Sequence, residues 1–196
     1  EPMLLGRYPA DLQPLVEGLV QEGDLATIRQ PLDFYGVNYF MPMRVGAAPE
    51  DSEMFFALYD LVGYPETDFG WPVVPDAMRE WLITFRARYR AALPPLVVTE
   101  CGAAYSGDPD ADGRVEDQAR IDYLHGHLEA VAAACRRGVD VRALYVWSLL
   151  DTFEWTEGYA QRFGLVHVDP ATQRRTPKES FHWLAELIAS QSPSVG

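Results

Sequence analysis

The chain has 196 residues, of which 48% are hydrophobic and 12% aromatic, which is enough to build the core of a folded domain. Its formal net charge of -13 disfavours nucleic acid as a partner, because phosphate binding requires clustered Lys and Arg. No apolar run approaches the roughly 20 residues that cross a bilayer, so we expect no membrane contact. With two cysteines and no export signal, the default location is cytoplasmic.

The first half of the chain predicts a short helical piece followed by a strand and a long helix. The helical piece is expected around residues 10–19. The stretch "LDFYGVNYF" at 32–40 has the aromatic and β-branched content of a strand. The long helix is expected at 75–93, because Pro75 and Asp76 are typical of a helix start.

The second half repeats the alternation of strand and helix. "LVVTE" at 96–100 is predicted as a strand, and a helix follows from about 117 to 137. Another strand is expected at 143–150, and the last helix at 176–190 with Thr176 as its cap. Strands that alternate with helices indicate a parallel sheet. Because no repeat or linker interrupts the pattern, residues 1–196 are predicted to form a single domain.

The helix predicted at 117–137 carries one apolar stripe. Its members recur at spacings of three and four and are Ile121, Leu124, Leu128, Val131 and Cys135. We expect this stripe to face the sheet, which places Cys135 in the core, and we interpret all four histidines as structural.

Each predicted strand ends in residues capable of chemistry: Asn38 and Tyr39 on the first, Glu100 on the second and Trp147 on the third. In β/α barrels, the strand ends and the loops after them converge on one mouth, where active sites are built. A closed barrel needs eight strands, and only three or four are visible. We therefore expect an α/β fold that is a partial (β/α)8 TIM barrel, which this chain does not close alone.

Glu100 alone is ambiguous, because an acid after a strand can also be a helix cap or a surface residue. Its context is the segment 146–169, in which two tryptophans lie close to acids. Such a cluster can be plain core packing. It can also be a sugar site, where aromatic faces stack on pyranose C–H groups and carboxylates accept hydrogen bonds from hydroxyls.

Several motifs together resemble glycoside hydrolase family 1, the β-glucosidase family. They are "LLGRYP" (4–9), "PLDFYGVNYF" (31–40), "VVTECGAAY" (97–105), "GRVEDQARIDYLHGHL" (113–128), "WSLLDTFEWTEGYAQRFGLVHVD" (147–169) and "RTPKESFHWL" (175–184). They occur in the family's order and at its spacing. The resemblance implies that residues 1–196 are the C-terminal portion of a (β/α)8 barrel of retaining β-glycosidases and supply its sixth to eighth β/α units.

The resemblance also implies roles for individual residues. Glu100 would be the catalytic nucleophile, which attacks the anomeric carbon. Glu154 would favour a non-phosphorylated glucoside, galactoside or fucoside, because members that act on 6-phosphorylated sugars lack an acid there. The residues implied to bind the sugar are Asn38, Trp147, Glu154, Trp155 and Phe163.

The chain departs from the family pattern in three places. The general acid/base lies in an Asn-Glu-Pro motif at the end of the family's fourth strand, and this chain has no such tripeptide. Cys101 stands where the family usually has Asn. Phe40 stands where the family has a Tyr that hydrogen-bonds the nucleophile, and Tyr39 cannot replace it because neighbouring strand residues point to opposite faces.

The sequence thus predicts a retaining β-glycosidase that hydrolyses O-glycosidic bonds, with carbohydrate as its small-molecule substrate. The general acid/base would come from a missing N-terminal half of the barrel, in the same parent chain or a separate polypeptide. The alternative is a catalytically inactive half-barrel remnant that binds sugar or self-associates through its open strand edges. No cofactor or metal is expected, because "DPDADG" at 108–113 has Ala119 where a calcium loop needs a bidentate Glu.

Overall fold

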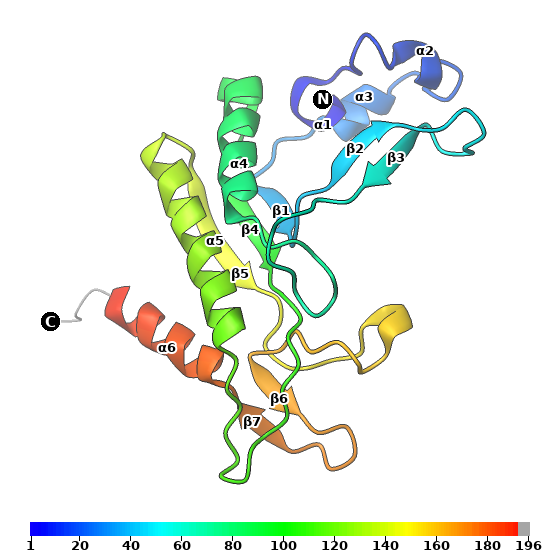
Figure 1. Cartoon of the computed structure of the whole chain (residues 1–196). Coiled ribbons are helices and arrows are strands. Elements are labelled where there is room, and N and C mark those ends of the chain that lie inside the picture. Colours follow the sequence, from blue (N-terminus) through cyan, green and yellow to red (C-terminus); the bar gives the residue numbers. More distant parts are fainter. Residues whose placement is uncertain (192–196) are drawn as a thin grey trace, which may run out of the picture.

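The computed structural model of the chain describes residues 1–191. A parallel three-stranded sheet lies at its centre, in the order β1–β4–β5. Figure 1 shows two long helices, α4 and α5, lying side by side along one face of this sheet. The strands are β1 (Tyr35–Tyr39), β4 (Leu96–Cys101) and β5 (Val141–Val146), and the helices are α4 (Pro75–Tyr89) and α5 (Gln118–Arg136). The predicted alternation of parallel strands and helices is confirmed, and residues 1–191 do not close a barrel.

Smaller elements, most of which the sequence did not predict, lie around the first strand. An antiparallel hairpin projects between β1 and α4, and three short helices precede β1 (Figure 1). The hairpin strands are β2 (Arg44–Ala47) and β3 (Phe56–Tyr59), and the helices are α1 (Pro2–Leu5), α2 (Gln13–Val16) and α3 (Asp24–Ile28). The helix expected at 10–19 is therefore reduced to the four residues of α2. The hairpin has few buried side chains, so no alternation of apolar and polar residues marks it in the sequence.

The last part of the chain corrects two predicted boundaries. The third strand ends at Val146 rather than at 150, and the peptide bond that follows it, between Trp147 and Ser148, is cis. Thr176 does not cap the last helix, because it pairs with His167 in a small antiparallel ladder. The remaining elements are η1 (Arg90–Ala92), η2 (Trp155–Glu157), β6 (Val166–Val168), β7 (Arg175–Pro177) and α6 (Glu179–Gln191).

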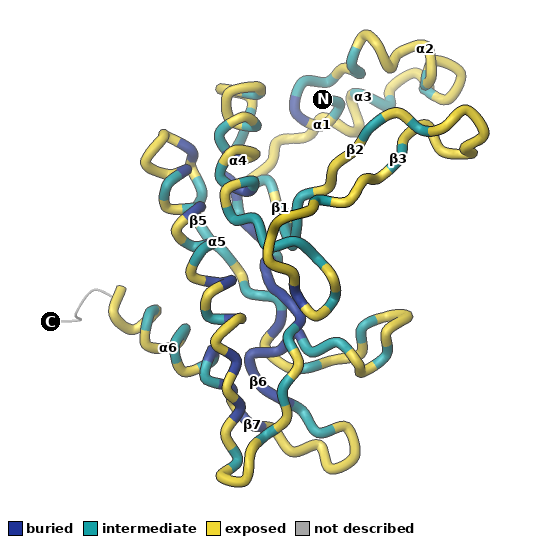
Figure 2. Tube along the Cα trace, in the orientation of Figure 1, coloured by how far each residue is buried: buried dark blue, intermediate teal, exposed yellow. Residues whose placement is uncertain are grey.

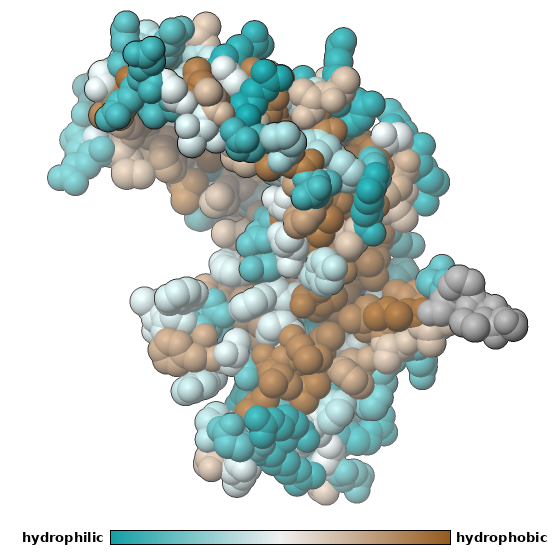
Figure 3. Space-filling view, turned by 180° about the vertical axis from the view of Figure 1, so that it is seen from behind, coloured by the Kyte–Doolittle hydropathy of each residue, from teal (hydrophilic) through white to brown (hydrophobic). Residues whose placement is uncertain are grey.

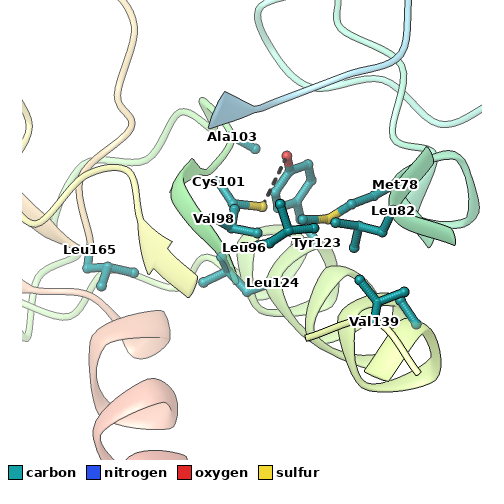
Figure 4. Close-up of a cluster of buried hydrophobic side chains, with 11 residues drawn as sticks. Met78, Leu82, Leu96, Val98, Cys101, Ala103, Tyr123, Leu124, Val139 and Leu165 are labelled. Atoms are coloured by element: carbon teal, nitrogen blue, oxygen red, sulfur yellow. Dashed lines mark hydrogen bonds between the residues drawn. The ribbon is translucent and has the colours of Figure 1, made fainter. Parts of the chain in front are cut away.

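The core fills the space between the sheet and the two long helices, as Figures 2 and 4 show. β4 is the central strand, and its residues Leu96 and Val98 are almost fully buried against Leu82 of α4 and Leu124 of α5.

Of the apolar stripe predicted on α5, Leu124 is buried and Val131 packs against the core, whereas Cys135 is exposed rather than in the core. The buried residues of α5 are Arg120, Tyr123, Leu124, His127, Ala130 and Ala134. A stripe defined by apolar residues alone omits two polar members of this buried face. Arg120 pairs there with Asp117, and Nδ1 of His127 lies 2.7 Å from the carbonyl oxygen of Tyr123.

Hydrophobic side chains also remain uncovered. Figure 3 shows them gathered over the middle of one face of the molecule. Around the sheet, the exposed fractions are 51% for Phe34, 61% for Tyr145 and 59% for Leu149. In the part of the chain that the structure describes, no helix has both the length and the apolar character needed to traverse a bilayer.

Candidate active site

The strand order brings the chemically capable strand ends to one edge of the sheet. Because β4 lies between β1 and β5, its last residues have a neighbour on each side. Asn38 of β1 pairs with Glu100, and Cys101 pairs with Val146 of β5, the residue before Trp147. The three ends that carry Asn38, Glu100 and Trp147 therefore lie next to one another, as the parallel arrangement requires.

The sheet is irregular at the position of Glu100. The β1–β4 register shifts between Val37 and Asn38, and the β4–β5 register shifts between Val98 and Cys101. Both shifts fall at Thr99 and Glu100. Such irregularities in a ladder re-aim side chains and are frequent next to active sites. Propensity and periodicity contain no signal for a register shift, so the sequence analysis missed it.

Asn38 is oriented by a neighbour on β4. The hydroxyl of Thr99 donates a hydrogen bond to Oδ1 of Asn38 over 2.6 Å. This bond uses the amide oxygen and leaves the amide nitrogen as a donor on an exposed surface. The structure thus presents an N–H donor on the residue whose backbone pairs with Glu100 in the sheet.

Cys101 follows Glu100 but faces the opposite side of the sheet. Its side chain is fully buried against α5, and its thiol donates a weak hydrogen bond to the hydroxyl of Tyr123 at 3.9 Å (Figure 4). Burial raises the pKa of the Cys101 thiol to about 12, so the thiol is neutral. Cys101 therefore belongs to the core rather than to the surface that Glu100 faces.

Tyr39 and Phe40 also separate across the strand, as the alternation of side chains predicted. The Tyr39 hydroxyl donates to the carbonyl oxygen of Val74 at 3.1 Å, and its ring contacts His127 of α5. Phe40 packs instead against Phe163, with ring centroids 6.1 Å apart. Tyr39 thus lies on the helix side of the sheet and Phe40 on the other side.

Phe40 is part of a cluster of four aromatic rings, in which neighbouring ring centroids are 4.5 Å to 6.1 Å apart. Its members are Phe40, Phe69, Trp71 and Phe163. Phe163 is only 2% exposed, so it forms the buried side of the cluster. The sequence analysis did not single out Phe69 and Trp71, although two aromatics within the Gly- and Pro-containing stretch "DFGWP" could have indicated them.

The carboxylate of Glu100 is not held by hydrogen bonds from the described part of the chain. Within residues 1–191, no group donates a hydrogen bond to it, which is consistent with Phe40, a residue without a hydroxyl, at the end of the neighbouring strand. Glu100 is half-buried and lies on the open side of the sheet.

The segments that leave β4 and β5 touch at Gly102. A Cβ atom at this glycine would overlap the carbonyl oxygen of Trp147. The backbone N–H of Trp147 also donates to the carbonyl oxygen of Cys101 at 3.0 Å. Only glycine permits this approach, which fixes the Trp147 backbone directly beside the end of the strand that carries Glu100.

Glu154 lies near enough to Glu100 for the two charges to interact. The pKa of the Glu154 carboxyl is raised above its ordinary value, mainly by partial burial and to a smaller extent by the negative charge of Glu100. Trp155 follows in a left-handed conformation with a φ of 40° and is 83% exposed. The structure therefore brings Glu154 toward Glu100 and leaves Trp155 extending into solvent.

Four charged side chains, none of which the sequence analysis assigned a role, form two buried ion pairs. Arg120 pairs with Asp117 at 2.8 Å, and Lys178 pairs with Asp151 at 3.0 Å. Burial lowers the pKa of Lys178 to about 8. Asp151 also accepts a hydrogen bond from the backbone N–H of Gly164 at 2.9 Å, which connects the two ends of the loop after β5.

No group of three or more His, Cys, Asp or Glu side chains within residues 1–191 could hold a metal ion. In the stretch 108–113, the carboxylate of Asp110 instead accepts hydrogen bonds from the backbone N–H groups of Asp112 and Arg114. This segment is a turn that is stabilised by its own side chain.

Comparison with known proteins places the chain in one family. The sequence model of glycosyl hydrolase family 1 matches residues 1–193. A bifunctional beta-D-glucosidase/beta-D-fucosidase of Bifidobacterium breve is 41% identical and matches 98% of this chain and 46% of its own length. The psychrophilic beta-glucosidase BglU of Micrococcus antarcticus is 39% identical with a TM-score of 0.89, over 98% of this chain and 46% of that one.

A beta-glucosidase of Thermotoga maritima, solved in complex with glucoimidazole, is 35% identical with a TM-score of 0.86. The match covers 96% of this chain and 42% of that one. The chain thus spans less than half the length of the relatives it matches, and its fold is part of the (β/α)8 barrel of these enzymes.

Proposed function

This chain belongs to glycosyl hydrolase family 1, and we propose that it forms the C-terminal portion of a retaining β-glycosidase. The substrates would be non-phosphorylated β-glucosides or related glycosides, and the protein would act in the cytoplasm. The observation that carries the proposal is the juxtaposition of Glu100, Asn38 and the Trp147 backbone at one edge of the sheet. A carboxylate, an amide donor and an aromatic side chain are the groups that a sugar site combines.

Glu100 is the nucleophile in this proposal. Its carboxylate attacks the anomeric carbon while the bond from that carbon to the aglycone oxygen breaks, and the departing oxygen takes a proton from a general acid. Water then attacks the anomeric carbon of the glycosyl–enzyme, and the bond from that carbon to Glu100 breaks. The water gives a proton to the same group, now acting as a base, and the carboxylate of Glu100 is regenerated. Retaining hydrolysis requires the two carboxyl groups about 5 Å apart. The second would come from outside this chain, because the chain lacks the Asn-Glu-Pro motif that carries the general acid/base in the family.

The substrate would bind between groups from all three strand ends. Trp147 would stack beneath the sugar ring, and the Asn38 amide would donate to a hydroxyl near the reacting carbon. Glu154 and Trp155 would bind other hydroxyls, with Phe163 lining the pocket beneath. The raised pKa of the Glu154 carboxyl supports this role. A carboxyl group near the charge of Glu100 suits hydroxyl partners, because a hydroxyl group can both donate and accept a hydrogen bond.

The second carboxyl group would come from an N-terminal portion of the barrel that docks on the open sheet. Three uncovered hydrophobic side chains around the sheet support this: Phe34, Tyr145 and Leu149 are each more than half exposed. Parallel sheets in β/α proteins are normally covered on both faces, whereas α4 and α5 cover only one face here. Residues 1–196 would then act as a single unit in a larger domain.

The proposal is tested by incubating the chain with a 2-deoxy-2-fluoro-β-glucoside that carries a dinitrophenyl leaving group, which departs without a general acid. Intact mass spectrometry, followed by peptide mapping, should find the added sugar on the peptide that contains Glu100. The same reaction is run with the N-terminal portion supplied as a separate polypeptide.

Three variants make the result specific. Glu100→Gln should abolish the label, because an amide is a poor nucleophile, and Glu157→Gln, at an exposed acid in the same region, should not. Phe40→Tyr should speed labelling, because a hydroxyl at that position can donate to the carboxylate of Glu100. If wild-type chain takes up no sugar even with the N-terminal portion present, the proposed function is wrong.

A further inference from the structure

Arg120 of α5 is a buried arginine whose five N–H donors all have partners. Its side chain is only 2% exposed, and Nε donates to the carboxylate of Asp117 at 2.8 Å. The remaining donors bind backbone carbonyl oxygens rather than side chains. These acceptors are the carbonyl oxygens of Ala103, Tyr105, Arg162 and Phe163.

The four carbonyl groups belong to two segments that are far apart in the sequence. Ala103 and Tyr105 lie directly after β4, three and five residues beyond Glu100. Arg162 and Phe163 close the loop that follows β5, and their carbonyl oxygens accept at 2.8 Å and 3.0 Å. One guanidinium group therefore joins the segment after Glu100 to the segment that carries Phe163.

A single guanidinium can do this because its donors are fixed in one plane. Nη1 donates to both Ala103 and Phe163, and Nη2 donates to both Tyr105 and Arg162. Each nitrogen thus spans the two segments. A lysine ammonium is a point donor on a flexible stem and cannot reproduce this geometry.

Asp117 connects the same guanidinium to the start of α6. Its carboxylate accepts from the hydroxyl of Ser180 at 2.5 Å and from the backbone N–H of Ser180 at 2.8 Å. Asp117 thereby compensates the buried positive charge and prevents rotation of the guanidinium.

We infer that Arg120 is a positioning residue, which sets the separation between the end of β4 at Glu100 and the aromatic cluster at Phe163. The inference rests on the proposed function for its catalytic meaning. Phe163 contacts Phe40, the residue that follows the strand paired with β4, so a shift at 162–163 changes the packing beside Glu100. Arg120 itself is almost fully buried, so it would act on the substrate only through these two segments.

The test compares Arg120→Lys with Arg114→Lys, a matched change at an exposed arginine that pairs with Glu179. Both chains are labelled with the fluoroglucoside over a range of concentrations, under the conditions that label the wild type. This gives the limiting labelling rate and the concentration for half that rate. For Arg120→Lys, we expect the limiting rate to fall at least tenfold, with less than threefold change in the half-saturating concentration. Arg114→Lys should match the wild type.

A purely structural role gives a different result. It would reduce the fraction of chain that is labelled, in proportion to the folded fraction measured by circular dichroism, and leave the limiting rate of the folded fraction unchanged. That outcome overturns the inference. If Arg120→Lys does not fold, Asp117→Asn is measured instead, and the limiting rate should fall in the same direction because the guanidinium is less well oriented.

Hydrogen–deuterium exchange separates this inference from the proposed function. In Arg120→Lys, the amides of 103–105 and 162–165 should exchange at least tenfold faster, while those of α4 stay unchanged. If the wild type takes no label but exchange changes in both segments, the proposed function fails and the coupling of the two segments stands. If exchange in both segments equals that of the wild type, the inference is wrong whatever the labelling shows.

Discussion

The loops after β4 and β5 and the hairpin β2–β3 are both irregular parts of the chain, but they are stabilised in opposite ways. In these loops, Ala103 and Ala104 are fully buried. The buried guanidinium of Arg120 binds backbone carbonyl oxygens, and the buried ammonium of Lys178 binds the carboxylate of Asp151. In the hairpin region, Phe55 is 94% exposed and Val62 is 84% exposed.

This comparison shows which part of the site the chain can build alone. The strand ends that carry Glu100 and Trp147 are fixed by contacts within residues 1–191. The hairpin presents apolar side chains to solvent, where each contributes nothing to the chain's own core. Substitutions in the two regions should therefore differ in size, and the predictions that follow are ordered from the largest effect to the smallest.

Asp117→Ala should have the largest effect, because it leaves the buried charge of Arg120 without its carboxylate partner. We expect the free energy of unfolding to fall by about 3–5 kcal/mol. Urea denaturation followed by circular dichroism measures this. Glu179→Gln, which breaks the exposed pair with Arg114, is the control and should cost about 1 kcal/mol or less. Equal effects of the two variants would remove the contrast between buried and surface charge.

Gly102→Ala should cost about 3 kcal/mol, because the new methyl group overlaps the backbone of Trp147 and cannot be accommodated by a rotamer change. The matched control is Gly18→Ala, since a Cβ atom at Gly18 meets no atom within 4 Å. Thermal unfolding of the two variants gives the comparison. If the Gly102→Ala chain is as stable as the wild type, the segments that leave β4 and β5 can move apart without loss of stability.

His127 should make the chain less stable in mild acid. Burial lowers its pKa from 6.5 to about 4, so the folded chain holds it neutral while the unfolded chain takes up a proton. Its stabilising contribution is complete above pH 6.5 and is lost as the pH falls, by about 2 kcal/mol at pH 5. His127→Gln should flatten this part of the stability profile. His125→Gln, on the exposed side of the same helix, should leave it unchanged.

Phe55→Ser should have the smallest effect on the chain alone. The ring is 94% exposed, so the free energy of unfolding should change by no more than about 0.5 kcal/mol. Leu82→Ala, at a fully buried position of α4, should cost about 3 kcal/mol in the same denaturation experiment. A large loss on Phe55→Ser would show that the hairpin packs against the chain in solution.

The sequence predicted the order of the main elements well. The three parallel strands lie within or next to the predicted ranges, and α4 and α5 begin at or beside the predicted positions. Periodicity, proline and glycine signals are local, and these elements obey local rules. The motifs also indicated the family, which the match over residues 1–193 confirms. The roles of Glu100 and of the sugar-binding residues stay predictions.

Only the tertiary structure decided the arrangement around those residues. The register shifts at Glu100, the burial of Cys101 away from the site and the four partners of Arg120 on two distant segments depend on which strands pair and which loops meet. No pattern in the sequence marks Arg120 as buried, because an arginine is buried only when the fold supplies an acceptor for each of its donors. By itself, the sequence determined the elements and the chemistry they can carry. Long-range backbone contacts determined how those groups face one another.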